Sequence, residues 1–175
     1  MASVSIQIEW LKSFKAGDLD TLCDATEKAI EVGLGFDWIK TPKRIVIERY
    51  WQGVLLVPER ELLIGRLNGI IAGAAQMVKP PPNNEAGFFN VVMTSFFVAP
   101  WARGHGMARG MMLEFEKKAK KLGFTQISLD VRETQEAAIT LYERAGYIRW
   151  SSKDKYARVN GKYIRGYYYT KDLSL

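Results

Sequence analysis

The segment from Val98 to Ala108 joins an apolar run to an amphipathic one and could bind an anion. It stops at Pro100, turns through Gly104 and Gly106, and then opens a stretch with helical periodicity. A helix start presents unpaired N–H groups and the positive end of the helix dipole. Glycines there remove the side chains that would keep a phosphate away from the backbone. The pattern therefore predicts a phosphate-binding turn, although a plain strand-to-helix turn has the same composition.

Two other kinds of phosphate loop do not fit this segment. A Walker-type loop requires Gly-Lys-Ser/Thr, and no such triplet follows the turn. The dinucleotide pattern Gly-x-Gly-x-x-Gly is not met, because Arg109 occupies the position of the last glycine and Gly110 lies one residue beyond. The prediction of an anion site therefore rests on the local order of strand, glycine turn and helix.

A second candidate for chemistry lies in residues 135–145, a stretch with helical spacing that stops at Gly146. Tyr142 falls on the same face as Ala138 and Leu141. A phenol can donate a proton in a reaction, so Tyr142 could serve as a general acid. A tyrosine packed in a core would show the same spacing, and the pattern leaves both interpretations open.

The first part of the chain reads as strand, helix, helix and hairpin. Thr41 followed by Pro42 is a good N-cap and N1 pair. Asn68-Gly69 accepts the positive φ angles of a two-residue hairpin turn. The expected elements are a strand at 4–8, a helix with Leu19, Leu22, Cys23, Thr26 and Ile30 on one face, a helix from Pro42 to about Gly53 with Val46, Tyr50 and Val54 on one face, and strands at 61–67 and 70–78.

The second part alternates strands and helices. Three prolines within residues 79–85 remove three hydrogen-bond donors, so a loop precedes a long strand at 88–98. The further expected elements are a helix along Ala108, Met111, Met112, Phe115, Ala119 and Leu122, a strand at 125–131, the helix at 135–145, and a hairpin of 156–159 and 162–170 around Asn160-Gly161.

This order of elements predicts an α/β fold made of one domain over residues 1–175. We expect a mixed sheet of about seven strands flanked by about four helices. The sheet should be antiparallel in its first half and in its last hairpin. The run of strand, helix, strand and helix in the second half favours parallel pairing of the fourth and fifth strands, with the intervening helix as crossover.

At this point the motifs resemble the GNAT acetyltransferases. The family's pyrophosphate signature, Gln/Arg-x-x-Gly-x-Gly/Ala, is matched by Arg103-x-x-Gly106-x-Ala108. Leu141-Tyr142-x-x-x-Gly146-Tyr147 is similar to the family's Leu-Tyr-x-x-x-Gly-Phe/Tyr segment, and the order of elements matches over nearly the full chain. The resemblance implies an N-acetyltransferase that uses acetyl-CoA as co-substrate and needs no metal.

The resemblance also implies a role for each matching residue. Main-chain groups of Phe96 and Val98 would bind the pantetheine arm where the fourth and fifth strands diverge. Tyr142 would protonate the departing CoA thiolate. Family members often carry an Asn that contacts CoA where this chain has Gln135, whose longer amide would take that position. The pyrophosphate would be held by the N–H groups of Arg103, Gly104, His105, Gly106, Met107 and Ala108.

The general base is left open by the sequence. Many family members carry a Glu on the fourth strand, and the predicted strand 88–98 contains no acid. A base is needed because an alkyl amine with a pKa of about 10 is mostly protonated at neutral pH. Glu85, Asp130 and ordered water are the candidates, although solvent exposure of Glu85 and a surface or helix-capping role of Asp130 fit equally. His105, the one histidine, is expected near a CoA phosphate or exposed.

Four further side chains bear on the acceptor and the mechanism. Trp38, Tyr50 and Trp51 lie where this family shapes its acceptor pocket, so they could stack on the substrate or pack in the core. Cys23 is the only cysteine and has apolar neighbours at helical spacing, which predicts a buried core thiol. We therefore expect direct transfer in a ternary complex rather than a covalent acyl-cysteine.

Composition bounds the partners and the compartment. The chain is 47% hydrophobic and carries a net charge of +6 that is scattered rather than gathered in a long basic run. We expect no nucleic acid as a partner, because the positive charge is scattered. We expect no membrane as a partner, because no window approaches the roughly 18 apolar residues of a span. The start of the chain does not resemble a signal peptide, and one cysteine cannot form an internal disulfide, so a cytoplasmic location is expected.

The acceptor is expected to be a small primary amine. Three alternatives stay open: a protein N-terminus or lysine side chain as acceptor, a non-catalytic domain that senses acyl-CoA, and a basic RNA-binding domain on the same fold. Tyr142 favours catalysis, and the sequence lacks the clustered basic and aromatic motifs of nucleic-acid binding. The chain is expected to be a monomer or a homodimer.

Overall fold

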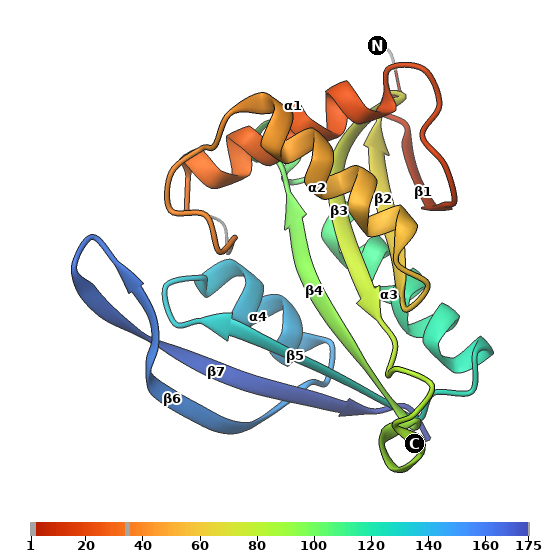
Figure 1. Cartoon of the computed structure of the whole chain (residues 1–175), viewed down its shortest axis with the longest axis vertical. Coiled ribbons are helices and arrows are strands. Elements are labelled where there is room, and N and C mark those ends of the chain that lie inside the picture. Colours follow the sequence, from red (N-terminus) through yellow and green to blue (C-terminus); the bar gives the residue numbers. More distant parts are fainter. Residues whose placement is uncertain (1–2, 34–35, 175) are drawn as a thin grey trace.

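The computed structural model describes residues 3–33 and 36–174, in which one seven-stranded mixed sheet lies between helices (Figure 1). The strand order is β1-β2-β3-β4-β5-β7-β6. Among the strands of the described residues, only β4 and β5 pair in parallel. The elements are β1 (Ile6–Leu11), α1 (Asp18–Glu31), α2 (Arg44–Leu56), β2 (Arg60–Leu67), β3 (Ile70–Val78), η1 (Glu85–Gly87), β4 (Asn90–Val98), η2 (Pro100–Ala102), α3 (Met107–Lys121), β5 (Gln126–Arg132), α4 (Glu136–Arg144), β6 (Ile148–Val159) and β7 (Lys162–Asp172). The predicted α/β architecture is confirmed.

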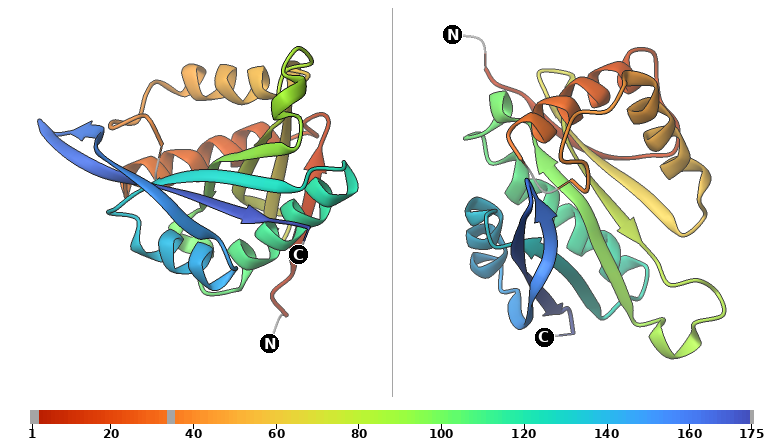
Figure 2. Two further views of the ribbon diagram at one scale, coloured as in Figure 1. Left: turned by 90° about the horizontal axis from the view of Figure 1, so that it is seen from below. Right: turned by 60° about the vertical axis from the view of Figure 1, so that its left-hand side comes forward.

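The four α-helices of the described residues pack in two pairs, one pair on each face of the sheet (Figure 2). Helices α1 and α2 pack on one face of β2, β3 and β4, and this core contains Leu22, Ile47 and Trp51. Helices α3 and α4 pack on the other face. The core there includes Met111 and Tyr169, and it contains residues of strands from β2 to β5 and of β7. None of the helices in the described part of the chain has the length and apolarity that a bilayer crossing requires.

Both predicted hairpin turns are confirmed. Asn68 and Gly69 have φ angles of 50° and 85°, and Asn160 and Gly161 have φ angles of 50° and 81°, as a two-residue turn with two left-handed positions requires. Strand β6 begins at Ile148, well before the predicted start at residue 156. Its first part is largely exposed, and after Ile148 and Trp150 residues 151–155 are all polar, so no sustained apolar alternation marks the strand.

The predicted start of the second helix is wrong. Helix α2 begins at Arg44, and Lys43 precedes it with an extended ψ of 144°, so Thr41 and Pro42 lie outside the helix. Its buried face consists of Ile47, Trp51 and Val54, so Val54 is buried as predicted, whereas Val46 is exposed and Tyr50 is half-buried.

Candidate functional site

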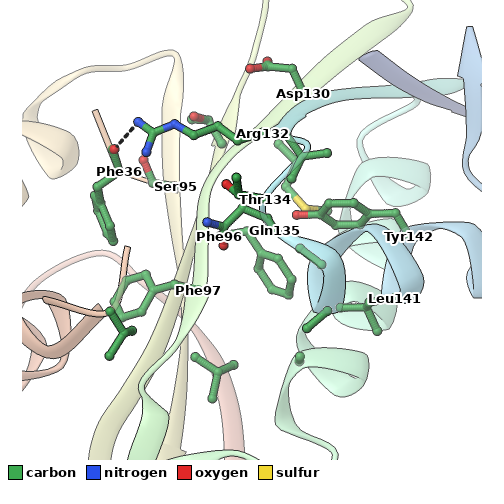
Figure 3. A pocket seen from close by; sticks show the side chains of 18 of the residues that line it. Phe36, Ser95, Phe96, Phe97, Asp130, Arg132, Thr134, Gln135, Leu141 and Tyr142 are labelled. Carbon is green, nitrogen blue, oxygen red and sulfur yellow. Dashed lines mark hydrogen bonds between the residues drawn. The ribbon is translucent and has the colours of Figure 1, made fainter. Parts of the chain in front are cut away.

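The strands β4 and β5 are paired over only part of their length. Their parallel ladder joins Asn90–Val92 to Gln126–Ser128 and then ends. Beyond this point a cavity of about 960 Å³ opens between residues 93–98 on one side and 130–132 on the other (Figure 3). Main-chain groups of β4 that would otherwise bond to β5 therefore face the cavity, as the predicted divergence of these strands requires.

A bulge in β4 forms one wall of this cavity. The register against β3 shifts between Ala74 and Gln76, and Ser95 takes a φ of 52°. A bulge re-aims side chains and leaves backbone groups unpaired, and bulges are common beside active sites. The Ser95 hydroxyl lies 3.0 Å from the Tyr50 hydroxyl and accepts from the Gln76 amide at 3.1 Å, while that amide also donates to Tyr50 at 2.6 Å. This network fixes the bulge to α2.

The predicted phosphate turn lies between η2 and α3. Gly106 is the N-cap of α3 with a φ of 77°, and Gly104 has a φ of 82°, so both adopt the left-handed conformation that glycine tolerates. No side chain caps the helix, and a Cβ added at either glycine would meet nothing within 4 Å. The first N–H groups of a 15-residue helix are therefore open to an anion, and Arg103 lines the adjacent cavity. These features fit the pyrophosphate of CoA.

Tyr142 reaches the cavity from α4 and points its hydroxyl toward β4 (Figure 3). Its side chain is only 5% exposed, and its ring packs near Phe96, with 6.2 Å between the ring centroids. The hydroxyl has no hydrogen-bond partner among the described residues that it contacts. Burial, with the nearby carboxylate of Asp130, raises the pKa of the Tyr142 phenol well above its usual value. The phenol is therefore protonated at neutral pH and available as a donor.

The far end of the cavity combines a carboxylate with aromatic side chains. Asp130 on β5 accepts a hydrogen bond from the Tyr156 hydroxyl on β6. Trp38 and Tyr50 also line the cavity, with 5.0 Å between their ring centroids in an edge-to-face arrangement. Trp51 does not, because it is fully buried and donates to the Thr26 hydroxyl at 2.9 Å.

Two side chains tie the connection after α1 to the connection after β5. Arg132 donates to the carbonyl oxygen of Phe36 at 2.6 Å, and Figure 3 shows its side chain crossing the cleft. The amide of Gln135 donates to the carbonyl oxygen of Gly33. Gln135 lines the cavity as well, but its amide NH₂ group already donates a hydrogen bond to the main chain of Gly33.

The structure gathers some of the predicted site residues in one cavity and leaves others at its edge. Gly104, His105 and Gly106 are exposed in the turn, and the Nδ1 atom of His105 lies 3.3 Å from the Ala102 carbonyl oxygen. Met107 is 2% exposed and forms part of the core. The predicted residues that line the cavity are Phe96, Val98, Arg103, Ala108, Asp130, Gln135 and Tyr142.

One base candidate lies away from the cavity, and several residues that line the cavity were not predicted. Glu85 lies in η1, before the paired end of β4, and does not line the cavity. Arg132 and Tyr156 were not predicted, because the fold brings them there from a strand end and from a distant hairpin. The signal that could have indicated Tyr156 is Gly166 in the middle of an aromatic strand, since an interior glycine often marks a close approach of another group.

Comparisons with known proteins agree with this geometry. The model of the acetyltransferase (GNAT) family matches residues 23–147. An uncharacterized N-acetyltransferase in the hisH-hisA intergenic region of Azospirillum brasilense is 52% identical over 130 residues, which cover 74% of this chain and 77% of that protein.

Solved structures show the same fold at low identity. An N-acetyltransferase from Staphylococcus aureus Mu50 has a TM-score of 0.80 at 17% identity, covering 98% of this chain and 99% of that one. The putative acetyltransferase yncA from Salmonella typhimurium, solved with its cofactor acetyl-CoA, has a TM-score of 0.76 at 15% identity and covers 96% and 94%. The family match and the curated relative assign the chain to the GNAT acetyltransferase family, as an acetyl-CoA-dependent N-acyltransferase.

Proposed function

We propose that the protein acetylates a small primary amine by direct attack on acetyl-CoA in a ternary complex. The observation that carries this proposal is one continuous cavity that joins the phosphate turn to a carboxylate. Arg103 and Ala108 line it beside the turn, Tyr142 lines its middle, and Asp130 lines its far end. Residues 1–175 would act as one domain, since β1, β6 and β7, outside the matched range, belong to the same sheet.

The residues beside the turn would bind CoA. When bound, acetyl-CoA supplies a thioester whose acyl carbon accepts the amine and whose sulfur departs as a thiolate. The free N–H groups from Gly104 to Ala108 and the guanidinium of Arg103 would hold the pyrophosphate. The backbone of Phe96 and Val98, unpaired beyond the end of the β4–β5 ladder, would bond the pantetheine arm.

Asp130 would act as the general base and Tyr142 as the general acid. The amine attacks only through its lone pair, so its ammonium form must first lose a proton. Asp130 is held by the Tyr156 hydroxyl on a strand that lines the cavity, and it would take this proton. Tyr142 is kept protonated by burial and would donate its proton to the departing sulfur. The fully buried Cys23 lies in the core under α1 and α2, which supports direct transfer.

A small acceptor is favoured over a protein by the way the far end of the cavity is bounded. The bond from Arg132 to Phe36 and the bond from Gln135 to Gly33 join two connecting segments across the cleft. A peptide chain needs an open groove in which its backbone can lie. A small amine needs only the part of the cavity beside Asp130, where aromatic rings can contact its apolar part or its charge.

The experiment that tests the proposal has two stages. Acetyl-CoA and CoA should raise the melting temperature, because a ligand that binds only the native state adds RT ln(1 + [L]/Kd) to its stability, whereas NAD should do little. Release of free CoA is then measured with a panel of small primary amines and with peptides bearing a free N-terminus or lysine. Protection by NAD equal to that by CoA would contradict the CoA site. Turnover of peptides alone would contradict the small-amine acceptor.

A further inference from the structure

The hairpin of β6 and β7 contains a bulge beside the cavity. Lys153 pairs with Gly166 and Ala157 pairs with Ile164, so the three residues between them on β6 oppose the single residue Arg165 on β7. Arg165 bonds one of the three, with its Nε atom 2.8 Å from the Asp154 carboxylate. An extra length of strand must turn out of the ladder, and it re-aims the side chains that it carries.

The bulge turns the Tyr156 ring over Gly166. A Cβ atom added at Gly166 would overlap the Cγ and both Cδ atoms of this ring. Gly166 is buried, and its φ angle is not in the left-handed region, so the position requires glycine for space rather than for conformation. The ring therefore lies against the backbone of β7, where a side chain at any other residue type would stand.

With its ring over Gly166, Tyr156 places its hydroxyl at Asp130. Gly166 pairs with Arg132, and Tyr168 pairs with Asp130, so these four residues share one face of the sheet. The Tyr156 hydroxyl donates to the Asp130 carboxylate. Asp130 is otherwise an exposed side chain on a strand, free to rotate about its χ1 angle.

We propose that Tyr156, seated by the bulge and by Gly166, is a positioning residue that fixes the Asp130 carboxylate toward the acceptor amine. The inference rests on the proposed role of Asp130 in the reaction. Tyr156 acts through that carboxylate, which keeps other lone pairs for the amine while one accepts from the phenol. Besides Asp130 and Tyr156, the titratable or charged side chains that line the cavity are Asp37, Tyr50, Arg103, Arg132, Glu136 and Tyr142.

The first test removes the hydroxyl alone. Tyr156→Phe keeps the ring over Gly166 and should lower kcat/KM for the acceptor by roughly tenfold to a hundredfold, the usual worth of a hydrogen bond to a charged group. The dissociation constant for acetyl-CoA should change by less than about twofold. A packing role would move only the melting temperature.

Tyr168→Phe is the matched control. Tyr168 lies beside Tyr156, with 6.1 Å between the ring centroids, and its hydroxyl makes no hydrogen bond to a described residue. Removing it should leave the acceptor kinetics unchanged from those of the wild type. Equal losses in both variants, or no loss in Tyr156→Phe, would overturn the positioning role.

The second test uses the glycine. Gly166→Ala in the wild-type background should displace the ring and lower acceptor kcat/KM at least as much as Tyr156→Phe does. In a Tyr156→Ala background the added methyl has no ring to displace, so Gly166→Ala should cause no further loss in rate or melting temperature. Additive losses would overturn the inference, and the double variant keeps the test valid even when Gly166→Ala alone folds poorly.

Asp130→Asn separates the two proposals. A protein that acetylates no amine contradicts the proposed function itself. When the wild type is active and Asp130→Asn loses activity while Tyr156→Phe keeps it, the role of Asp130 stands and the positioning role of Tyr156 falls. When Asp130→Asn keeps full activity, both the base and its positioning residue are wrong.

Discussion

The two halves of the sheet are packed differently. Strands β2 and β3 are buried almost end to end, because α1 and α2 cover one face and α3 covers the other. Strand β5 alternates between buried and partly exposed residues, since in the described structure only the face toward α3 and α4 is covered (Figure 2). On the open face Trp150 is 65% exposed and lies against Tyr168.

The difference explains where chemistry is located in this fold. In the doubly covered half, a buried charge must be paired, as Asp18 and Arg66 are at 2.8 Å. In the half with one open face, Asp130 and Tyr156 reach both the cavity and solvent. The site lies at the boundary, where β4 belongs to the closed half and β5 to the open half and their ladder ends. Substitutions in the open half should therefore change turnover, and those in the closed half should change stability.

The largest effect is expected at Tyr142. Tyr142→Phe deletes the proton donor and keeps the ring, which packs near Phe96. Loss of a general acid typically lowers the rate by roughly 10²- to 10⁴-fold, so kcat should fall by about that factor. The hydroxyl has no hydrogen-bond partner among the described residues, so the melting temperature and the dissociation constant for acetyl-CoA should stay near those of the wild type. Steady-state acetylation, calorimetry and thermal unfolding measure the three quantities.

A tyrosine that only packs in the core predicts the reverse result. Stability would then change while turnover stayed nearly intact. A folded Tyr142→Phe with wild-type kcat would rule out the acid role, provided that chemistry limits the wild type. A pre-steady-state burst would reveal product release as the slow step, in which case the rate of the burst itself is compared between the two proteins.

In the closed half, Asp18→Asn should destabilise the protein without changing the active site. The substitution replaces one of the two Asp18 oxygens that accept from Arg66 with an amide NH₂ group, while Arg66 keeps its ion pair with Glu9 at 2.7 Å, and it should cost roughly 2 kcal/mol, or about 4 to 8 °C in melting temperature. Asp24→Asn is the control, because Asp24 is 68% exposed in its ion pair with Arg44 and should contribute less than about 1 kcal/mol. Equal losses in the two variants would contradict the comparison.

The same pair predicts a pH dependence. The hydrogen bond from Arg66 holds the pKa of Asp18 below its usual value of 3.8. A carboxylate with a lowered pKa in the folded state stabilises the protein above its unfolded pKa and loses this contribution as the pH falls through the folded pKa. The difference in unfolding free energy between wild type and Asp18→Asn should therefore be full at pH 7 and should shrink below about pH 4. Chemical denaturation across this range measures it.

Most of the fold could be predicted from local patterns. The hairpins at Asn68 and Asn160 follow from turn chemistry, and the parallel pairing of β4 and β5 follows from the intervening helix. The start of α2 could not be predicted, because the pair Thr41-Pro42 is compatible both with the first residues of a helix and with the extended segment just before one. The part of β6 before residue 156 was missed because only Ile148 and Trp150 are apolar in it and residues 151–155 are polar, so no sustained apolar period marks the strand.

The candidate site could be predicted most directly where a motif is contiguous. The turn from Arg103 to Ala108 and the residue Tyr142 each belong to a short motif that can be read in one place. The contact of Tyr156 with Asp130 depends on a bulge, on a glycine across the ladder and on the register between β5 and β7. Register is a tertiary property, because a slip of one residue exchanges the two faces of a strand.

At the boundary between the halves, Gly106→Glu should weaken acetyl-CoA binding. It introduces a negative charge where the N–H groups of α3 would meet pyrophosphate, and like charges in contact cost several kcal/mol, so the dissociation constant should rise by roughly a hundredfold. Gly106→Asn is the control, since Asn tolerates the left-handed φ of 77° and adds no charge. Calorimetry measures both, and circular dichroism checks the fold. Unchanged affinity in Gly106→Glu would contradict the phosphate-binding turn.

The smallest effect on turnover is expected at Cys23, in the closed half. Cys23 is fully buried, and burial raises the pKa of its thiol to about 12, so the nucleophilic thiolate is absent at neutral pH. Cys23→Ala should destabilise the protein by roughly 1 kcal/mol through lost packing and leave kcat within about twofold of the wild type. An aromatic disulfide reagent should modify the native thiol only after unfolding. A large loss of kcat, or rapid labelling that acetyl-CoA prevents, would indicate a covalent acyl-cysteine and overturn direct transfer, because a carrier thiol must reach the thioester carbon. The core under α1 and α2 separates Cys23 from Tyr142, which belongs to the core on the opposite face of the sheet, so we expect neither result.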